Sequence, residues 1–424
     1  MKINIIMKKD NLKFIFNNDK IFSIQIYIPL GSIHEKEGEY GISHFLEHMK
    51  FKKSKDINKK NLLQEFEKIV FWNAYTSKDH TSYYMRSNEE DYKKMIKIMY
   101  ELVFNTSFTD NDIDIERKVI EEEKLLREPN IDKLKDMDLE QDLSITSIGN
   151  PYNRKIIGVM DDIKKITNKK LEKYNSLYFN NFLVVISCSK SNEKEISNKC
   201  LKLFPNSLNK KEKELENIQS FNYSLIIRNF GLPQNKSVII FKSYNQLNQN
   251  KYYLDFIQDI LFSKKSSILT KILREKNGFV YGVTGGNENY KDIGTFRIEV
   301  SSNSNNSITR ILNILFNEIT KLKDKQLDKA TFNKYKKNFK NKMKYVFKDD
   351  DYLITKMGEY LYYDNDFTLD KYKDIINKLT PDIFKEIIND LFDYNTMSIV
   401  TYGNYPNTSE TKEKLLKIVK KIKN

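Results

Sequence analysis

Alternation of hydrophobic and polar residues predicts strands in both halves of the chain. Residues 22–28 and residues 236–242 alternate in this way. So do residues 81–86 and 295–300, and each of these two segments leads into apolar residues at the spacing of a helix. Since strands and helices follow one another in both halves, the pattern predicts an α+β fold class.

The predicted elements repeat at a nearly constant offset. Positions 22 and 236 lie 214 residues apart, and the same offset separates position 81 from position 295. A helix followed by a strand also recurs near the end of each half, at 171–186 and 383–400. Chance similarity of two ordinary α+β stretches is the alternative. Three paired landmarks at one offset favour an internal duplication, with a period too long for a solenoid.

The duplication predicts two domains joined by a linker. The predicted domains are residues 1–206 and residues 222–424. Between them, residues 207–221 are polar and rich in lysine, glutamate and asparagine, a composition typical of a linker.

Composition limits the class of protein. Of 424 residues, 39% are hydrophobic, which is enough for packed cores and excludes bulk disorder. The sequence has no uninterrupted apolar run near the roughly 18 residues that a membrane-spanning helix needs, so no membrane span is expected. Cys188 and Cys200 are the only cysteines, too few for a disulfide framework, and they predict a reducing cytoplasm.

The net charge of +14 raises the question of a nucleic-acid partner. The lysines, however, are interspersed with acids, as in residues 209–214. This pattern favours a solvated mixed-charge surface, and no nucleic-acid partner is predicted. A basic RNA-associated protein is the weaker alternative, and its RNA binding would fall steeply with salt.

Two of the four histidines fall within five residues, His44-Phe45-Leu46-Glu47-His48. On a helix, positions i, i+3 and i+4 share one face, so His44, Glu47 and His48 project together. Two imidazoles at i and i+4 can bind zinc, and a carboxylate beside them can take a proton from the attacking water. Two surface histidines in an ordinary helical contact are the alternative, but histidine is so scarce here that the metal site is favoured.

A third ligand is predicted on the helix 110–127, for which Asp110 or Asn111 is the expected N-cap. Glu116 and Glu123 lie two turns apart on one face of this helix, flanked by apolar residues. Carboxylates in an apolar stripe need a cation. The alternatives are a surface acid for Glu116 and an ion pair with Arg127 for Glu123. The histidine pair favours Glu123 as the third ligand, with Glu116 orienting a ligand.

These residues resemble the active site of the pitrilysin family, which includes insulin-degrading enzyme, mitochondrial processing peptidase and bacterial half-size peptidases. Residues 44–48 match its inverted zinc motif HxxEH, and residues 41–51 match its active-site helix. Residues 116–123 match the segment that carries its third ligand. The resemblance implies one Zn²⁺ per chain and a catalytic zinc-binding domain in residues 1–206. The implied roles are zinc ligation by His44, His48 and Glu123, general base for Glu47, and ligand orientation by Glu116.

The resemblance extends to a substrate strand. The segment Asn73-Ala74-Tyr75-Thr76 resembles the family's edge strand, whose backbone pairs with an extended peptide. A plain edge strand fits these residues equally well. The family usually has a glycine pair before Asn-Ala, whereas residues 70–72 are Val-Phe-Trp here. These bulky residues are predicted to alter the turn and the neighbouring subsite.

In the second half, residues 273–281 resemble the family's Arg-x6-Tyr clamp. Arg274 would hold a substrate carbonyl, and Tyr281 would donate a hydrogen bond to the oxyanion. A packing role, with Gly278 as a helix C-cap and Tyr281 beginning a strand, is the alternative.

The resemblance further implies two homologous α/β-roll domains in tandem that form half of a clamshell. Two such chains would close around a chamber, so that zinc from one chain meets Arg274 and Tyr281 of its partner. The implied protein is a zinc metalloendopeptidase that hydrolyses oligopeptides or unfolded peptide segments, a peptide-maturation protease among the possibilities. It would act as a homodimer or as a heterodimer with a related chain. The alternative is a non-catalytic scaffold or partner subunit.

Overall fold

A computed structural model gives the fold as two compact units that are not consecutive in sequence. The first unit comprises residues 1–129, 154–216 and 346–369, and the second comprises residues 130–153, 217–345 and 370–424. The structure describes residues 5–9, 11–17, 20–54, 71–127, 151–205, 221, 223–303, 308–347, 349, 352–364 and 367–423. The predicted linker lies almost wholly outside these residues, and the predicted domain boundaries remain a prediction.

The first unit is built on a six-stranded sheet. Its strand order is β1 (Ile5–Lys9), β2 (Leu12–Asn17), β8 (Leu183–Ser189), β3 (Ile21–Ile28), β6 (Thr81–Asn88) and β5 (Phe71–Thr76). The β2–β8 pair is parallel, and every other neighbouring pair is antiparallel. Alternate residues of β3, among them Phe22, Ile24 and Ile26, point into one hydrophobic core.

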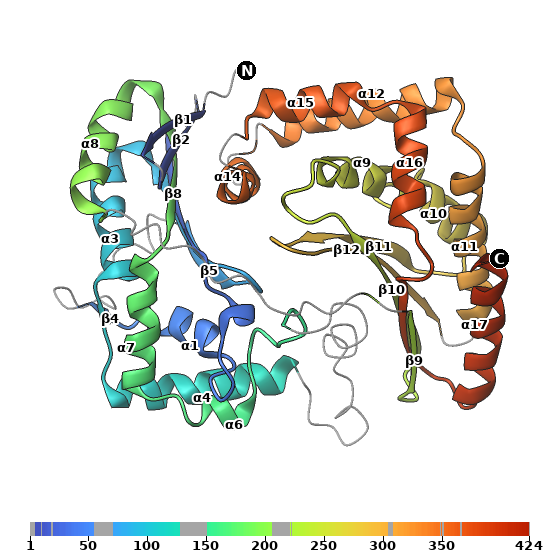
Figure 1. Cartoon of the computed structure of the whole chain (residues 1–424), viewed down its shortest axis with the longest axis horizontal. Coiled ribbons are helices and arrows are strands. Elements are labelled where there is room, and N and C mark those ends of the chain that lie inside the picture. Colours follow the sequence, from blue (N-terminus) through green and yellow to red (C-terminus); the bar gives the residue numbers. More distant parts are fainter. Residues whose placement is uncertain are drawn as a thin grey trace. The chain divides into compact units, whose positions relative to one another are not determined.

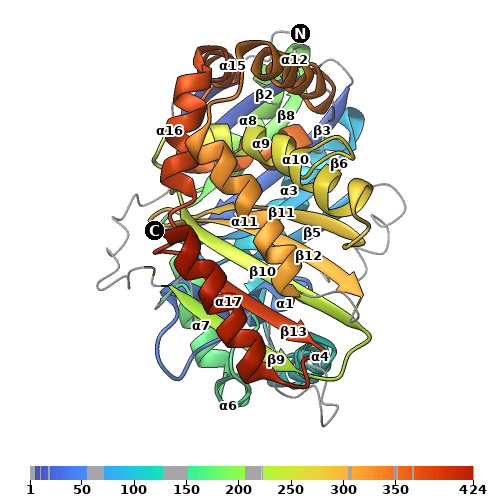
Figure 2. The same ribbon diagram turned by 90° about the vertical axis from the view of Figure 1, so that its right-hand side faces the viewer.

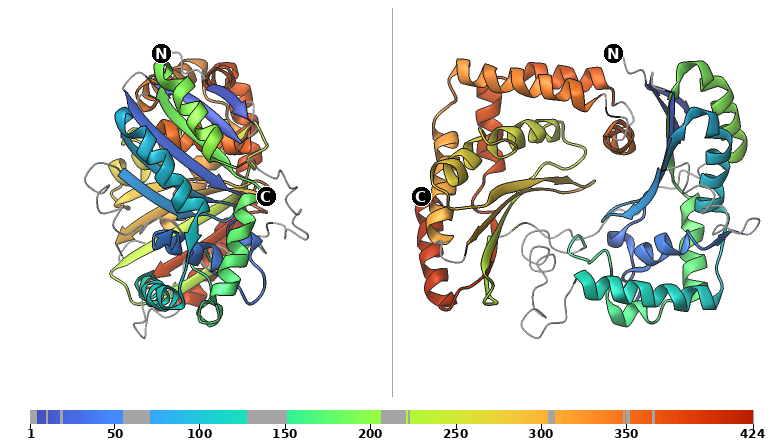
Figure 3. Two further views of the ribbon diagram at one scale, coloured as in Figure 1. Left: turned by 90° about the vertical axis from the view of Figure 1, so that its left-hand side faces the viewer. Right: turned by 180° about the vertical axis from the view of Figure 1, so that it is seen from behind.

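Helices cover the apolar face of this sheet. The core residues of the strands pack against α1 (Ile42–Met49), α3 (Tyr92–Phe104), α7 (Asn168–Ser176) and α8 (Glu193–Leu203). The left panel of Figure 3 shows α3 and α8 lying across this face. The helix predicted over 110–127 is present as α4 (Asp110–Arg127). The predicted N-cap is wrong, because Thr109, the residue before α4, exchanges hydrogen bonds with Asp112 in the first turn.

The opposite face of the first sheet carries buried polar residues such as Lys13 and Gln25 beside apolar ones, and it is covered by a segment from late in the chain. This segment contains a π-helical turn (Leu353–Met357) and α14 (Gly358–Tyr363), seen on the other side of the sheet from α3 in Figure 1. The Tyr27 hydroxyl donates to the Thr355 carbonyl at 3.1 Å, and the Lys13 ammonium donates to the Leu361 carbonyl at 3.1 Å. A Cβ at Gly358 would lie 2.7 Å from the Tyr27 hydroxyl, so a larger residue there would have to displace the Tyr27 side chain.

The second unit repeats this sheet with one strand fewer. Its strand order is β11 (Gly282–Asn289), β12 (Gly294–Asn303), β10 (Gln234–Ser243), β13 (Ser398–Gly403) and β9 (Ser224–Asn229). Figure 2 shows α11 (Ile308–Asp324), α16 (Pro381–Leu391) and α17 (Thr408–Lys423) on one face of this sheet. Helices α9 (Lys251–Leu261) and α12 (Lys329–Val346) also belong to this unit.

The two sheets have matching topology. Strands β2, β8, β3, β6 and β5 occur in the same spatial order as β9, β13, β10, β12 and β11. The outer pair β13–β9 is parallel, like β2–β8, and the remaining pairs are antiparallel. The predicted α+β class with two homologous halves is therefore confirmed. Within the described residues, we find no helix that is both long and apolar enough to cross a membrane.

Candidate metal centre

Helix α1 carries the histidine motif into the first unit. His44 and Glu47 are buried and His48 is half-buried, while Phe45, Leu46 and Met49 pack into the core. The helix begins after Gly41, which has a φ of +100° that favours glycine. The motif residues therefore sit on a helix whose apolar face fixes its orientation, and the polar face turns toward α4.

Three ligand atoms converge between α1 and α4. One donor atom each from His44, His48 and Glu123 lies within 4.8 Å of the other two. Glu123 Oε2 is 3.6 Å from His44 Nε2 and 3.4 Å from His48 Nε2. Ligands bonded at about 2.0–2.1 Å to a tetrahedral zinc are separated by roughly 3.4 Å, so this donor set fits a zinc ion. The side chain of Arg127, the alternative partner of Glu123, lies outside the described residues.

Glu116 orients one of the two imidazoles. Its Oε1 lies 2.7 Å from His48 Nδ1, and its other oxygen pairs with Lys52. Since an ionised carboxylate only accepts, Nδ1 carries the proton and Nε2 is left with its lone pair toward the ligand cluster. Burial lowers the pKa of His48, but the hydrogen bond and charge of Glu116 outweigh it and the net shift is upward. Glu116 is buried, so a surface acid at this position is wrong.

Glu47 has a partner that sequence reasoning missed. The hydroxyl of Thr76 donates to Glu47 Oε2 at 2.7 Å, and both side chains are buried. Thr76 is the last residue of β5, and its side chain lies on the same face of the strand as Trp72 and Ala74, which pack on the core. Strand alternation could have placed Thr76 on the side of α1, but nothing in the sequence indicates which residue it contacts.

Two buried charged residues hold the ends of α1, and neither was predicted. At the N-terminus, the carboxylate of Glu35 accepts the Gly41 N–H at 2.8 Å and the Ser43 N–H at 3.0 Å. After the C-terminus, the Lys50 ammonium donates to the Val103 carbonyl at 2.6 Å and to the Thr106 hydroxyl at 3.2 Å. Burial raises the pKa of Glu35 to about 7, against the opposing effect of the two backbone hydrogen bonds.

The predicted substrate strand is an edge strand of the first sheet. Among the described residues, β5 pairs only with β6. Asn73 is exposed, Ala74 is half-buried, and Tyr75 is partly exposed on the face opposite to Ala74. Phe71 and Trp72 lie within β5 itself, where Trp72 packs against Phe51 with ring centroids 4.7 Å apart. Val70 lies outside the described residues.

Arg274 and Tyr281 lie together in the second unit. The Arg274 guanidinium is 5.6 Å from the centre of the Tyr281 ring. Gly278 ends the preceding helical turn with a φ of +62°, and the Tyr281 N–H donates to the Ser301 carbonyl just before β11 begins. The Tyr281 side chain is 82% exposed, which argues against the alternative of a packing role.

Comparison with protein families gives two adjacent matches. Residues 15–157 match the family model described as insulinase, peptidase family M16, and residues 165–339 match the peptidase M16 inactive domain. His44, Glu47, His48, Glu116 and Glu123 all fall in the first match. The second match, which contains Arg274 and Tyr281, carries no histidine.

Individual relatives cover most of the chain. An uncharacterized zinc protease of Rickettsia bellii is 29% identical over 73% of this chain and 75% of its own length. The uncharacterized zinc protease YmxG of Bacillus subtilis is 25% identical over 92% of this chain and 96% of its own length. Among solved structures, a protease from Helicobacter pylori has a TM-score of 0.82 at 21% identity, with 95% of this chain and 99% of that chain covered.

Proposed function

The chain belongs to the insulinase family of peptidases, family M16, and on that basis we propose that it is a zinc-dependent endopeptidase of oligopeptides and unfolded peptide segments. The observation that carries the proposal is the donor set of His44, His48 and Glu123, whose spacing fits a tetrahedral zinc ion. Glu47 lies on the same helix as the two histidines, and its carboxylate accepts a hydrogen bond from the Thr76 hydroxyl.

The proposed roles follow from the chemistry of each side chain. Zinc held by His44, His48 and Glu123 would supply a Lewis acid for the attacking water and the scissile carbonyl. Glu47 takes the proton from the attacking water and passes it to the leaving amine. Glu116 keeps the Nδ1 proton on His48, so that the other ring nitrogen faces the ligand cluster.

Peptide binding and oxyanion stabilisation would use residues outside the metal cluster. We propose that an extended peptide adds to the edge of β5 that has no neighbouring strand among the described residues, where Asn73, Ala74 and Tyr75 offer backbone groups. Tyr281 would donate a hydrogen bond to the oxyanion, and Arg274 would hold a neighbouring carbonyl. The exposure of Tyr281 and its contact with Arg274 support such a role. In the proposed dimer, these two residues come from the partner chain.

A direct test combines metal analysis with peptide cleavage. Purified protein should contain one zinc per chain and cleave a quenched fluorescent peptide library, and a chelator should abolish cleavage until zinc is restored. Glu47→Gln should retain zinc but lose cleavage by at least about a hundredfold, because it removes the general base. Glu122→Gln, an exposed change on α4, is the matched control and should behave as wild type. A metal-free protein, or an active Glu47→Gln variant, would refute the proposal and favour a non-catalytic scaffold.

A further inference from the structure

The turn between β5 and β6 contains three successive ionisable residues that are buried. Lys78, Asp79 and His80 are only 4%, 3% and 5% exposed. Charged side chains are rarely buried to this degree unless they have partners, and tight turns usually lie at the surface. The hydrogen-bond partners of these side chains therefore indicate the role of the turn.

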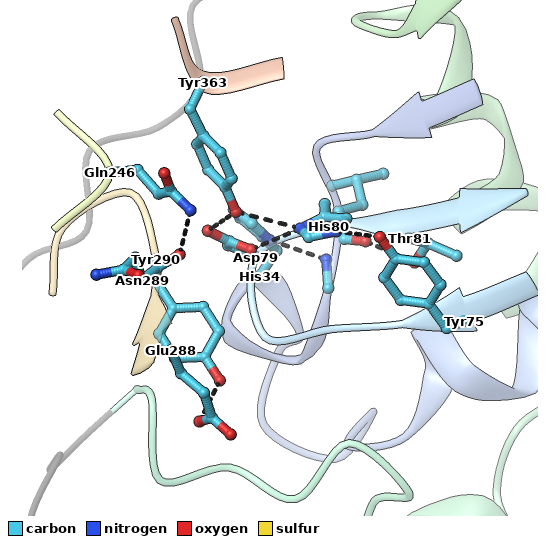
Figure 4. A network of polar contacts seen from close by, with 12 residues as sticks. His34, Tyr75, Asp79, His80, Thr81, Gln246, Glu288, Asn289, Tyr290 and Tyr363 are labelled. Carbon is cyan, nitrogen blue, oxygen red and sulfur yellow. Dashed lines mark hydrogen bonds and ion pairs between the residues drawn. The ribbon is translucent and has the colours of Figure 1, made fainter. Parts of the chain in front are cut away.

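A hydrogen-bond chain runs through the turn from α14 to β5 (Figure 4). The Tyr363 hydroxyl donates to Asp79 Oδ2 at 2.7 Å, and His80 Nδ1 lies 2.8 Å from Asp79 Oδ1. His80 Nε2 lies 3.3 Å from the Tyr75 hydroxyl. Because an ionised carboxylate only accepts, His80 donates to Asp79 through Nδ1, and its other ring nitrogen contacts the Tyr75 hydroxyl.

Aromatic packing reinforces this chain. The ring of His80 lies 5.3 to 6.1 Å, centroid to centroid, from four tyrosine rings, those of Tyr27, Tyr75, Tyr362 and Tyr363. Burial raises the pKa of the Tyr75 hydroxyl, so this group keeps its proton beside His80. Because the Tyr75 hydroxyl keeps its proton, this Asp–His–Tyr arrangement does not generate a nucleophile. It is suited instead to hold the Tyr75 side chain in place.

Tyr75 and Thr76 fix the end of β5 from opposite faces. Successive side chains of a strand point to opposite sides, so Thr76 reaches Glu47 while Tyr75 reaches His80. An edge strand is paired along one side only, and side-chain contacts must supply the rest of its rigidity. The contacts of Tyr75 therefore help to orient the end of the predicted substrate strand, opposite the contact of Thr76.

We propose that Tyr363, acting through Asp79 and His80 on Tyr75, is a positioning residue that holds β5 in its peptide-binding position. This inference rests on the proposed peptidase function. It makes the segment 352–364, which is remote in sequence from the metal ligands, a necessary part of the peptide-binding site.

The test compares peptide binding by variants that differ in single hydroxyl groups. Tyr363→Phe should weaken binding of a library-derived peptide to the Glu47→Gln protein by about tenfold, measured by fluorescence anisotropy. In the active protein it should raise KM by a similar factor, while zinc content and the thermal midpoint stay close to wild type. Tyr345→Phe, at a tyrosine that is 75% exposed, is the control and should leave both quantities unchanged.

A double-mutant cycle separates positioning from a general loss of structure. If Tyr363 acts through Tyr75, then in a Tyr75→Phe protein the further change Tyr363→Phe should cost no additional affinity. Additive effects, unchanged binding by Tyr363→Phe, or a binding loss accompanied by an equal loss of zinc would overturn the inference. Each of these outcomes leaves cleavage by wild type intact, whereas an inactive wild type would refute the proposed function itself.

Discussion

At the residue scale, a buried hydroxyl group helps to orient the Glu47 carboxylate. Thr76 Oγ1 lies 2.7 Å from Glu47 Oε2 in a buried environment, where such a bond to a charged acceptor is strong. Thr76→Val keeps the shape of the side chain and removes the donor. We expect kcat to fall about tenfold with zinc content unchanged, because the general base loses its fixed position.

Thr76→Ser is the matched control for this prediction. Serine retains the hydroxyl, so steady-state kinetics should show most of the wild-type kcat. Equal losses in the valine and serine variants would point to packing of the threonine methyl group, and the role of the hydroxyl would have to be abandoned.

Glu35 leads to a prediction about pH. Its pKa is about 7 in the folded protein, raised from 4.5 chiefly by burial. The folded state therefore binds more protons than the unfolded state between these two values, so stability falls as pH rises through this window. Relative to Glu35→Gln, wild type should lose up to about 3 kcal/mol of its free energy of unfolding between pH 4.5 and pH 7.

Urea unfolding of both proteins at several pH values between 4.5 and 8 measures this difference. Above pH 7 the two oxygens of the ionised carboxylate accept the N–H groups of Gly41 and Ser43. A glutamine amide has one oxygen, and its NH₂ group cannot accept, so it cannot replace both hydrogen bonds. Parallel pH curves for the two proteins would show that Glu35 does not titrate in this range.

At the element scale, the start of helix α1 depends on a close approach of two glycines. A Cβ on Gly158 would lie 2.3 Å from the Tyr40 carbonyl oxygen and 2.4 Å from the Gly41 Cα. Gly158→Ala must therefore displace the segment that leads into the histidine helix. We expect a lower unfolding midpoint and at least about tenfold weaker zinc binding in competition with a chromogenic chelator.

Gly38→Ala is a control matched in backbone conformation. Gly38 has a φ of +78° and Gly158 a φ of +79°, but a Cβ at Gly38 would meet no atom within 4 Å. Both variants carry similar backbone strain, so the difference between them measures the steric contact at α1. Identical zinc affinities in the two variants would show that α1 does not depend on this approach.

The elements themselves differ in how far the sequence predicts them. Helices α1 and α4 were predicted because their ligands and apolar residues follow a local period, and the spacing of Glu116 and Glu123 depends only on that period. The capping of α4 by Thr109 was not predicted, because Asp110 and Asn111 are next to it and are equally favoured as N-cap residues. The contacts of Thr76, Glu35 and Tyr363 join residues 6 to 284 positions apart, and no local period encodes them.

At the scale of the whole molecule, the duplication was predictable from the sequence. Which segments of the chain belong to each unit was not. Matching strand order and a matching parallel pair in the two sheets follow from repeated local patterns at one offset. The packing of residues 346–369 with the first unit follows instead from long-range contacts, such as those of Thr355 and Leu361 with the first sheet. Sequence periodicity cannot show which unit a helix packs against, because the apolar face of an amphipathic helix fits either sheet.

The proposed dimer leads to the last prediction, which tests whether one site uses residues of two chains. The ligand set lies in the first unit, and Arg274 and Tyr281 lie in the second. If Tyr281 serves the partner's zinc site, a Glu47→Gln chain and a Tyr281→Phe chain, each nearly inactive as a homodimer, should complement each other. In the mixed dimer, one site combines the intact Glu47 of one chain with the intact Tyr281 of the other.

Co-expression of the two variants with different affinity tags, and purification by both tags, isolates the mixed dimer. Light scattering should give twice the chain mass of 50.4 kDa, and peptide cleavage should recover to about half of the wild-type rate per dimer, because one of two sites is intact. If Tyr281 instead served the zinc of its own chain, neither site in the mixed dimer would be complete and no activity would return. Failure to recover any doubly tagged protein, together with an active monomer, would exclude the shared site altogether.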